Sequence, residues 1–231
     1  MVGIIAALGI ELELLRQSLE NEASRVISGR IYYTGFLYGR QVVMAVCGVG
    51  KVNAAVCAQT MCLEFKPELI INTGVAGALA SGLAVGDVVV ASCAVQHDMD
   101  TSAIGDPLGT LSVADKSLIR LPCDESIADA LLSFAYELGA NTRLGVVASG
   151  DQFIHSPERK DFLISEFGAV CCEMEGGAIA HVCALNATKC AIVRVMSDSA
   201  DGGAPTDFGL FAPKAARLGA AIVRNFLSQK E

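Results

Sequence analysis

The sequence predicts an α/β protein with a largely buried, mixed sheet. Short apolar runs of strand type alternate with segments of helical periodicity along the chain. Hydrophobic residues make up 52% of the 231 residues and charged residues only 18%, so the chain can bury a substantial core. No linker, repeat or low-complexity segment divides the sequence, and residues 1–231 are therefore expected to form one domain.

The first half of the chain contains most of the expected strands. A first helix is predicted by leucine and isoleucine residues that recur about one turn apart between residues 10 and 19. A second helix is expected to run from residue 48 to about residue 63. Apolar runs predict strands, the second and third of them joined as a hairpin, at residues 2–7, 31–37, 41–47, 68–73 and 87–96.

The second half alternates in the same way after an irregular stretch at residues 97–122. A loop of that length in a compact domain usually has a function or covers an interface. Ser156 and Pro157 are typical of a helix start, with serine at the cap and proline in the first turn. The other elements expected here are a helix at 124–138, a strand at 142–149 and a final helix from 206 to about 227.

The charge of the chain favours a small or neutral ligand. Its 25 acidic and 17 basic residues give a net charge of -8, which argues against a nucleic-acid partner. The sequence also has no cluster of lysine and arginine residues that would suggest a membrane-surface site. Residues 69–86 carry no charge, but their glycines favour a buried strand running into a glycine-rich loop over a membrane helix.

The nine cysteines are expected to be buried thiols in a reducing cytoplasm. Their number is odd, Cys171 and Cys172 are adjacent, and no C-x-x-C pair offers a zinc or redox motif. No basic residue precedes the first apolar run, and Glu11 and Glu13 follow it almost at once. A signal peptide is therefore not expected.

Familiar nucleotide, metal and hydrolase motifs do not fit the sequence. The GVGK segment at residues 48–51 resembles the end of a phosphate loop, but Ala45 and Val52 replace the glycine and hydroxyl residue that a Walker loop needs. We interpret it as a tight strand-to-helix turn. No H-E-x-x-H or G-x-S-x-G occurs, and His181 is expected to pack on its helix. The histidines are too scattered for a metal pattern: His97, His155 and His181.

Acids gather between residues 170 and 200, at the ends of expected strands. Glu173 and Glu175 lie between an apolar run and a Gly-Gly pair that opens a helix-like segment. A second apolar run, with Arg194 inside it, ends on Ser197-Asp198. Strand tips of this kind are where open α/β folds build ligand crevices. The alternative is that Glu173 and Glu175 are solvated loop acids.

Residues 72–77, Asn-Thr-Gly-Val-Ala-Gly, are expected to turn after the strand at 68–73. The bare backbone amides of such a turn can approach an anion or a hydroxyl-rich ligand. The glycines can equally serve a turn that only steric reasons demand, and both interpretations stay open.

Seven segments together resemble the bacterial 5'-methylthioadenosine/S-adenosylhomocysteine nucleosidases of the nucleoside phosphorylase superfamily. Any one of these segments is weak support, but all are in the same order and at similar spacing across nearly the entire chain. They are VGIIAAL with Glu11 just after it, GVGKVNAA, INTGVAGAL, VGDVVV with HDMD, SGDQFI, CEMEGGAIAHVC and VRVMSDSAD.

The resemblance implies a three-layer α/β/α sandwich and an enzyme that hydrolyses an N-glycosidic bond. The implied substrates are 5'-methylthioadenosine and S-adenosylhomocysteine, with 5'-deoxyadenosine as a further candidate, and adenine is released. A homodimer is also implied, in which the long loop after Asp100, with Ile104 in it, completes the pocket of the neighbouring subunit. No metal and no organic cofactor is expected.

Individual residues match the catalytic positions of that family. Asp198 resembles the general acid that protonates adenine N7, which is needed because the adenine anion leaves poorly. Glu11 matches the base that orients and deprotonates the attacking water, and Glu175 matches the residue that binds the ribose hydroxyls. The resemblance adds further substrate-binding residues: Val75, Gly77, Phe153, Ile154, Glu173, Met174, Arg194, Ser197 and Phe208.

Several of these residues have a more specific place by resemblance. Phe153 resembles the aromatic residue that stacks on adenine, and the backbone of Ile154 would bind the edge of the base. Met174 would pack on the sugar, Arg194 would lie beside the water and the ribose, and Phe208 would line the sugar and the 5' side.

The sequence departs from the common pattern of the family near the 5' group. Val75 stands where many members have a serine, Leu8 replaces a methionine, and Ile104 stands where some relatives have an aromatic ring. Gly9-Ile10 replaces acidic residues before Glu11. These changes bear on the preferred 5' substituent more than on the reaction.

Three rival functions fit parts of the pattern. A nucleoside phosphorylase of the same fold would need cationic or amide donors for phosphate, whereas a carboxylate at Glu11 repels a dianion and suits water. A futalosine-type nucleoside is an alternative substrate for hydrolysis. A non-catalytic nucleoside-binding protein would have no need of Glu11, Glu175 and Asp198 together.

Overall fold

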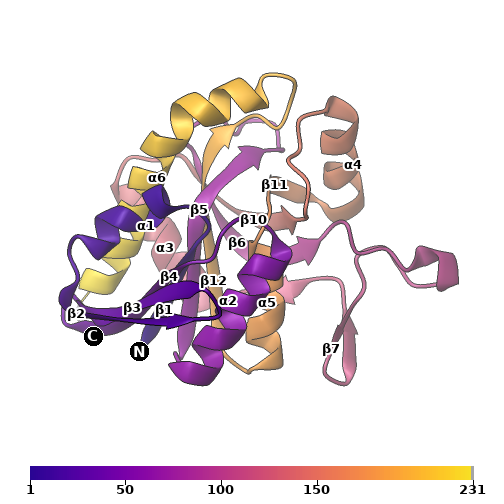
Figure 1. The fold of residues 1–231 in the computed structure, drawn as a ribbon. Helices are drawn as coiled ribbons and strands as arrows, with labels where there is room; N and C mark the ends of the chain where they lie inside the picture. The colour runs from indigo at the N-terminus through magenta and orange to yellow at the C-terminus, as the bar shows by residue number, and fades with distance from the viewer. Residues whose placement is uncertain (230–231) are drawn as a thin grey trace.

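The computed structural model describes residues 1–229 and is organised around a ten-stranded sheet (Figure 1). Along the sheet the strands follow the order β11-β10-β6-β12-β5-β1-β4-β3-β2, and β9 pairs with β6. Parallel and antiparallel pairs occur side by side, so the predicted mixed sheet is confirmed. The strands are β1 (Val2–Ala6), β2 (Glu20–Ile27), β3 (Arg30–Leu37), β4 (Arg40–Val46), β5 (Leu69–Ala78), β6 (Val88–Gln96), β9 (Leu121–Pro122), β10 (Thr142–Ser149), β11 (Ala169–Glu173) and β12 (Lys189–Asp198).

Helices cover both faces of the sheet and give the three-layer α/β/α arrangement (Figure 1). On one face α1, α3 and α6 bury Leu12, Leu131 and Ile222 in a common apolar cluster. On the other face α2 and α5 bury Met61 and Ile179. The helices are α1 (Gly9–Arg16), α2 (Lys51–Glu64), α3 (Glu125–Glu137), α4 (Pro157–Phe167), α5 (Gly176–Leu185) and α6 (Ala204–Ser228).

Five strands close into a ring because β11 bonds to two strands that lie apart in the main order. It runs parallel to β10, and its end pairs antiparallel with β5 through Cys171 with Ala78 and Cys172 with Gly77. β6 and β12 complete the ring between β10 and β5. Asp198, the last residue of β12, also pairs with Gly77. The ends of β5, β11 and β12 therefore meet at one place in the fold.

The structure corrects the expectations for the start of the chain. α1 ends at Arg16, and Leu19 lies outside the helix that was predicted to contain it. The following residues form β2, which was not predicted from the sequence. Nearly all side chains of β2 are exposed, so the strand lacks the apolar alternation of a half-buried strand. Hydrogen bonding to β3 is what defines it.

The turn expected at residues 72–77 is wrong, because β5 continues through them as a strand. Gly74 and Gly77 lie where two carboxylates approach the strand closely. A Cβ on Gly74 would lie 3.0 Å from Glu11 Oε1, and a Cβ on Gly77 would lie 2.8 Å from Asp198 Oδ1. These glycines therefore make room for acidic side chains and do not serve a turn.

The stretch at residues 97–122 contains only short elements and projects from the body of the molecule (Figure 1). Its elements are the 3-10 helix η1 (Ser102–Ile104), the hairpin of β7 (Leu111–Val113) and β8 (Lys116–Leu118), and the pairing strand β9. His181 was expected to pack on its own helix, but its Nε2 lies 2.9 Å from the carbonyl oxygen of Ser112. The histidine therefore links α5 to the hairpin.

The predicted hairpin and the predicted helix cap are confirmed. The hairpin of β3 and β4 forms, and Ser156 caps α4 by accepting a hydrogen bond from Arg159 N at 3.3 Å. All nine cysteines are free thiols, and seven of them are buried. Within residues 1–229 no helix has both the length and the apolar character needed to cross a bilayer.

Candidate active site

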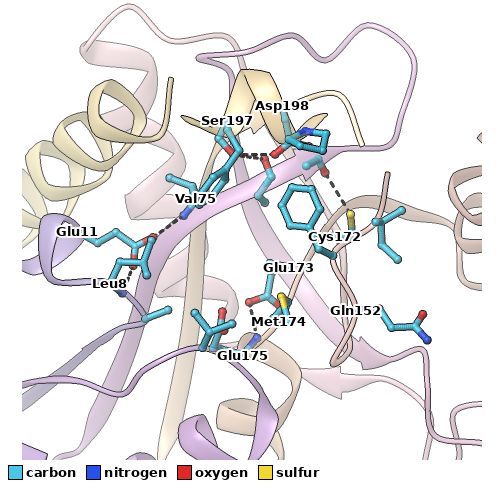
Figure 2. Close-up of a pocket in the computed structure, with 18 residues that line it drawn as sticks. Leu8, Glu11, Val75, Gln152, Cys172, Glu173, Met174, Glu175, Ser197 and Asp198 are labelled. Atoms are coloured by element: carbon cyan, nitrogen blue, oxygen red, sulfur yellow. Dashed lines mark hydrogen bonds between the residues drawn. The ribbon is translucent and has the colours of Figure 1, made fainter. Parts of the chain in front are cut away.

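A cavity of about 470 Å³ lies at the meeting point of β5, β11 and β12. In Figure 2 the labelled acids lie around one hollow, with Glu11 of α1 at the left, Asp198 beside Ser197 at the top, and Glu173 and Glu175 below. Residues predicted from the sequence supply most of the lining: Glu11, Val75, Gly77, Phe153, Ile154, Glu173, Met174, Glu175, Ser197, Asp198 and Phe208.

Two predicted residues do not line the cavity. Arg194 is 2% exposed and lies beneath the surface, where its guanidinium donates to Glu173 Oε2 at 2.5 Å. Arg194 is therefore not part of the cavity wall, and its place beside the ribose stays a prediction from the resemblance. Ile104 lies on η1 and is 82% exposed, outside the cavity of its own chain.

Seven further residues that line the cavity were not predicted as site residues from the sequence. Three of these residues, Ala76, Gln152 and Cys172, adjoin an assigned residue in the chain, and that neighbourhood could have indicated them. Val49 and Pro205 carry no polar group, and no sequence signal marks them. The unassigned lining residues, including Leu8, which was noted only as a departure, are Ala7, Leu8, Val49, Ala76, Gln152, Cys172 and Pro205.

Asp198 ends β12 and is 2% exposed. Its Oδ1 accepts from Ala200 N at 2.9 Å, and its Oδ2 accepts from Ser197 Oγ at 2.9 Å. Burial raises the pKa of Asp198 above its ordinary value, although these two hydrogen bonds oppose the shift. The raised pKa favours a carboxyl group that can hold a proton and donate it.

Lys160 holds the segment that follows Asp198 against the end of β5. Its Nζ donates to Ser199 O at 2.7 Å and to Ala78 O at 3.0 Å. The ammonium group of α4 therefore bridges the segment after Asp198 to the end of β5, and both meet at the cavity.

Glu11 lies in the first turn of α1 and is 3% exposed. Its carboxylate accepts from Leu8 N at 2.8 Å, which caps the helix, and from Val75 N at 3.1 Å (Figure 2). Burial raises the pKa of Glu11, and the Leu8 hydrogen bond and the charge of Arg194 oppose this. A partly desolvated carboxylate with a raised pKa is suited to accept a proton from water.

Glu173 has its carboxylate engaged on every side. Besides the Arg194 contact, its Oε2 accepts from Glu175 N at 3.0 Å and from Gly176 N at 2.8 Å, and its Oε1 accepts from Ser149 Oγ. Burial alone would raise its pKa, but the charge and hydrogen bonds of Arg194 and the other donors lower it overall. Glu173 is thus an ionised acid that organises the start of α5.

Glu175 has the opposite electrostatic character although it is only two residues away. It is 6% exposed, and its Oε1 accepts from Gly50 N at 2.8 Å. Burial and then the charge of Glu173 raise its pKa to about 7. Since Glu173 is 8% exposed, the interpretation of these two residues as solvated loop acids is wrong.

Two aromatic rings of the cavity lining, those of Phe153 and Phe208, pack against each other. Phe153 and Phe208 are arranged edge to face, with ring centroids 5.8 Å apart and an interplanar angle of 85°. Phe153 remains 42% exposed, so its ring has free surface for a planar ligand. A cavity lined by both acids and aromatic rings suits a molecule with a polar sugar and a flat base.

No group in residues 1–229 assembles three or more histidine, cysteine or acidic side chains in an arrangement that could hold a metal ion.

Known proteins with this sequence pattern and fold are enzymes that act on nucleosides. The family model described as the phosphorylase superfamily matches residues 1–228. A 5'-methylthioadenosine/S-adenosylhomocysteine nucleosidase from Actinobacillus succinogenes is 34% identical, over 100% of this chain and 99% of its own. An aminodeoxyfutalosine nucleosidase from Helicobacter pylori is 33% identical, over 99% of this chain and 98% of its own.

A solved structure agrees with this chain in both sequence and fold. The 5'-methylthioadenosine/S-adenosylhomocysteine nucleosidase of Neisseria meningitidis, in complex with methylthio-immucillin-A, superposes with a TM-score of 0.93. It is 36% identical, and the match covers 98% of each chain. The chain described here belongs to the phosphorylase superfamily, in the group of its 5'-methylthioadenosine/S-adenosylhomocysteine and aminodeoxyfutalosine nucleosidases.

Proposed function

We propose that this protein hydrolyses the N-glycosidic bond of 5'-methylthioadenosine and S-adenosylhomocysteine, releasing adenine and a 5-thio-substituted ribose. The observation that carries the proposal is the convergence of Glu11, Glu175 and Asp198 on one cavity, from three separate parts of the chain. Relatives named for this activity match along the entire chain, which supports the same choice of substrate.

In the proposed reaction Asp198 transfers its proton to N7 of adenine as the bond between C1' and N9 breaks. The bonding electron pair goes to the purine, which leaves as neutral adenine. The sugar acquires oxocarbenium character, and buried carboxylates around it stabilise that charge. The raised pKa of Asp198 keeps the proton available for this step.

Glu11 is proposed to take a proton from the attacking water while the oxygen of that water forms its bond to C1'. One proton thus leaves Asp198 and one arrives at Glu11, and exchange with solvent restores both acids. The hydrogen bond from Val75 N holds the Glu11 carboxylate at the wall of the cavity. All proposed steps use water and side chains of this chain.

The remaining residues are proposed to hold the substrate. Glu175 binds the ribose hydroxyls, Met174 packs against the sugar, and Phe153 stacks on adenine with the Ile154 backbone at the edge of the base. Phe208 covers the sugar and the 5' side. Arg194 is proposed to act from beneath the cavity wall on the acids, since it pairs with Glu173 and its charge acts to lower the pKa of Glu11.

A phosphorylase is disfavoured by the composition of the cavity wall. Among the described residues, none of those lining the cavity is lysine, arginine or histidine, while Glu11 presents a carboxylate where the nucleophile would bind. A phosphate dianion would be repelled there, whereas water would not.

We propose a homodimer in the cytoplasm, acting in methionine salvage and nucleoside catabolism, with residues 1–231 as one domain. Ile104 supports the dimer, because a large apolar side chain that is 82% exposed on a projecting loop gains stability when a second copy covers it. The free thiols are typical of a reducing compartment. In this arrangement Ile104 would complete the 5' side of the partner's cavity.

Adenine release, followed by chromatography with and without inorganic phosphate, tests the proposal. We expect release from 5'-methylthioadenosine at a rate that phosphate does not change, with free thio-ribose as the second product. Phosphate-dependent release of a sugar phosphate would instead establish a phosphorylase. Binding of the nucleoside without any release would establish a binding protein.

Parallel measurements of kcat/KM should rank the nucleosides. We expect higher values for 5'-methylthioadenosine and S-adenosylhomocysteine than for aminodeoxyfutalosine, with 5'-deoxyadenosine included in the comparison. A clear preference for aminodeoxyfutalosine would replace the proposed substrate and leave the hydrolytic mechanism standing.

A further inference from the structure

We infer that Lys51 is a positioning residue of this site, an inference that rests on the nucleosidase activity proposed above. Lys51 begins α2 and is absent from the lining of the cavity. It closes a ring of polar contacts that locks the start of α2 to the chain that follows β10. Val49, just before α2, and residues 152–154, after β10, line the cavity.

The ring consists of side-chain and backbone contacts among three segments. Lys51 Nζ donates to Asp98 Oδ1 at 2.6 Å and to Gln96 Oε1 at 3.1 Å. Asp98 Oδ2 accepts from Asp151 N at 2.9 Å. Asp151 Oδ1 in turn accepts from Lys51 N at 2.7 Å, so the chain of contacts returns to the residue where it began.

The ion pair in this ring is shielded from water. The side chains of Lys51 and Asp98 are only 19% and 18% exposed. Burial acts to raise the pKa of Asp98, but the hydrogen bond of Lys51, the Asp151 amide and the charge of Lys51 lower it overall. Removing one partner of such a pair leaves the other charge partly buried and uncompensated, so the segments would separate.

The first connection to the cavity runs through the start of α2. Gly50, directly before Lys51, donates its N–H to Glu175 Oε1 at 2.8 Å. Gly50 has a φ of 97°, and a Cβ there would lie 3.1 Å from Asp151 Oδ1, so the residue is held tightly between the two carboxylates. Lys51 thereby fixes the amide that stabilises the ionised form of Glu175.

The second connection runs through the chain after β10. Asp151 directly precedes the three consecutive residues Gln152, Phe153 and Ile154 of the cavity wall. Because Asp98 holds the Asp151 amide and Lys51 holds Asp98, the position of the Phe153 ring depends on the same ion pair.

This role connects two sequence segments: GVGK, which was interpreted only as a turn, and HDMD, which was named only as part of the resemblance. Lys51 of GVGK and Asp98 of HDMD form the ion pair. The Lys51 ammonium faces a carboxylate and an amide oxygen, which is an environment that serves to hold chain segments together and not to bind a phosphate.

Glu175 is the group through which the effect becomes measurable. Burial contributes most to its raised pKa; the charges of Glu173 and Glu11 raise it further, and the Gly50 amide and Arg194 lower it. The Cys47 thiol is also close enough to interact with it. Loss of the Gly50 contact would therefore raise the pKa of Glu175 beyond about 7.

The test compares Lys51→Met with Lys51→Arg and with the matched control Lys189→Met. Lys189 pairs with Asp124 at 3.0 Å at the opposite end of β12 from Asp198. For Lys51→Met we expect kcat/KM for adenine release from 5'-methylthioadenosine to fall about 10- to 100-fold. The acidic limb of its pH profile should shift to higher pH, and Lys51→Arg should restore most of both properties.

Lys189→Met should leave both kcat/KM and the pH profile unchanged. A purely structural role of Lys51 would lower the melting temperature and the active fraction but would not move the limb of the profile. A Lys51→Met profile that coincides with that of the wild type therefore overturns the inference. If Lys51→Met does not fold, Asp98→Asn, which keeps the side-chain shape, should give the same shift, and an unshifted profile there overturns it equally.

The inference and the proposed function fail in different ways. A wild-type protein that releases no adenine refutes the proposed function. Calorimetric titration with 5'-methylthioadenosine then still tests the positioning role, since we expect Lys51→Met to bind about 10-fold more weakly. Equal affinity of the two proteins in that titration overturns the role of Lys51.

Discussion

Three buried acids that line the same cavity differ in how firmly they hold a proton. Burial raises the pKa of Asp198, burial and the charge of Glu173 raise that of Glu175 to about 7, and Arg194 lowers that of Glu173. Environments that separate the pKa values of neighbouring carboxyl groups are what acid and base roles require. At the scale of single residues, the site is therefore defined by donors and charges as much as by the acids.

Replacing Asp198 by asparagine removes the proposed general acid while keeping nearly the same shape. We expect kcat for adenine release to fall about 10²- to 10⁴-fold, the range typical of general acid catalysis. The dissociation constant for 5'-methylthioadenosine and the circular dichroism spectrum should change little. Adenine release at the wild-type rate would remove Asp198 from the mechanism.

Glu175 should make the stability of the protein depend on pH. Its pKa in the folded protein, about 7, lies above the ordinary value of 4.5, so protonation favours the fold. This contribution is complete below a pH of about 4.5 and is lost as the pH rises through about 7. Glutamine does not titrate, so Glu175→Gln does not lose this contribution. As the pH rises from about 4.5 to above 7, the unfolding free energy of Glu175→Gln should therefore increase relative to that of the wild type by on the order of 3 kcal/mol.

Urea unfolding of the wild type and Glu175→Gln at acidic, neutral and mildly alkaline pH measures the difference. The other buried acids are common to both proteins, so their contributions largely cancel in the comparison. A difference in unfolding free energy that is the same at every pH would show that Glu175 has an ordinary pKa.

The acids at strand ends were predictable from the sequence, because polar groups directly after apolar runs are visible in it. The arrangement beneath them was not. Resemblance gave Arg194 a place beside the ribose but did not show that its guanidinium donates to Glu173 and Asn72 in the interior. No pattern in the chain reveals a pairing between side chains 21 residues apart that depends on how two strands come together.

At the scale of elements, β5 shows how a strand adapts to the carboxylates beside it. Gly77→Ala would place a Cβ 2.8 Å from Asp198 Oδ1 and 3.0 Å from the Ala200 Cβ. We expect Asp198 to be displaced and kcat/KM to fall about 100-fold. The matched control is Gly209→Ala in α6, where an added Cβ has no neighbour within 4 Å.

Gly209→Ala should raise the unfolding free energy by about 0.5–1 kcal/mol, since alanine is the better helix former. Thermal unfolding and adenine release of the two variants provide the comparison. An active Gly77→Ala protein would mean that the end of β5 can move without affecting Asp198.

Elements were predictable where burial imposes a periodic pattern and unpredictable where it does not. β1, β4 and β12 are apolar and buried almost throughout, and runs of that kind are plain in the sequence. β2 exposes nearly every side chain, and only its hydrogen bonds to β3 define it. The strand predicted at residues 68–73 was shorter than β5 because the glycines that follow are typical of a turn. In the structure these glycines are required by close contacts with Glu11 and Asp198, which lie far away in the sequence.

At the scale of the whole molecule, the projecting loop around η1 makes the proposed assembly testable. Ile104→Glu would place a charge where we propose contact between copies. We expect the wild type to sediment as two copies of the 24.0 kDa chain and the variant to shift toward one. KM for S-adenosylhomocysteine should rise in the variant, because the 5' side of each cavity would be incomplete.

A wild-type protein that sediments as a single chain at enzyme-assay concentrations, with full activity, would contradict both the dimer and the role of Ile104. Thr101→Ala, on the same loop but with a smaller and polar side chain, is the control for the loop itself. It should leave the sedimentation coefficient unchanged.

β5 is bonded to β12 through residues 69–77, to β1 through residues 69–72 and to the end of β11 through residues 77 and 78. The amide protons of residues 69–72, which have a strand on each side, should be among the last to exchange with deuterated water. We therefore expect the strand that leads into the cavity wall to persist between turnovers, with or without a nucleoside bound. Denaturant should abolish ligand affinity and β5 protection at one common concentration.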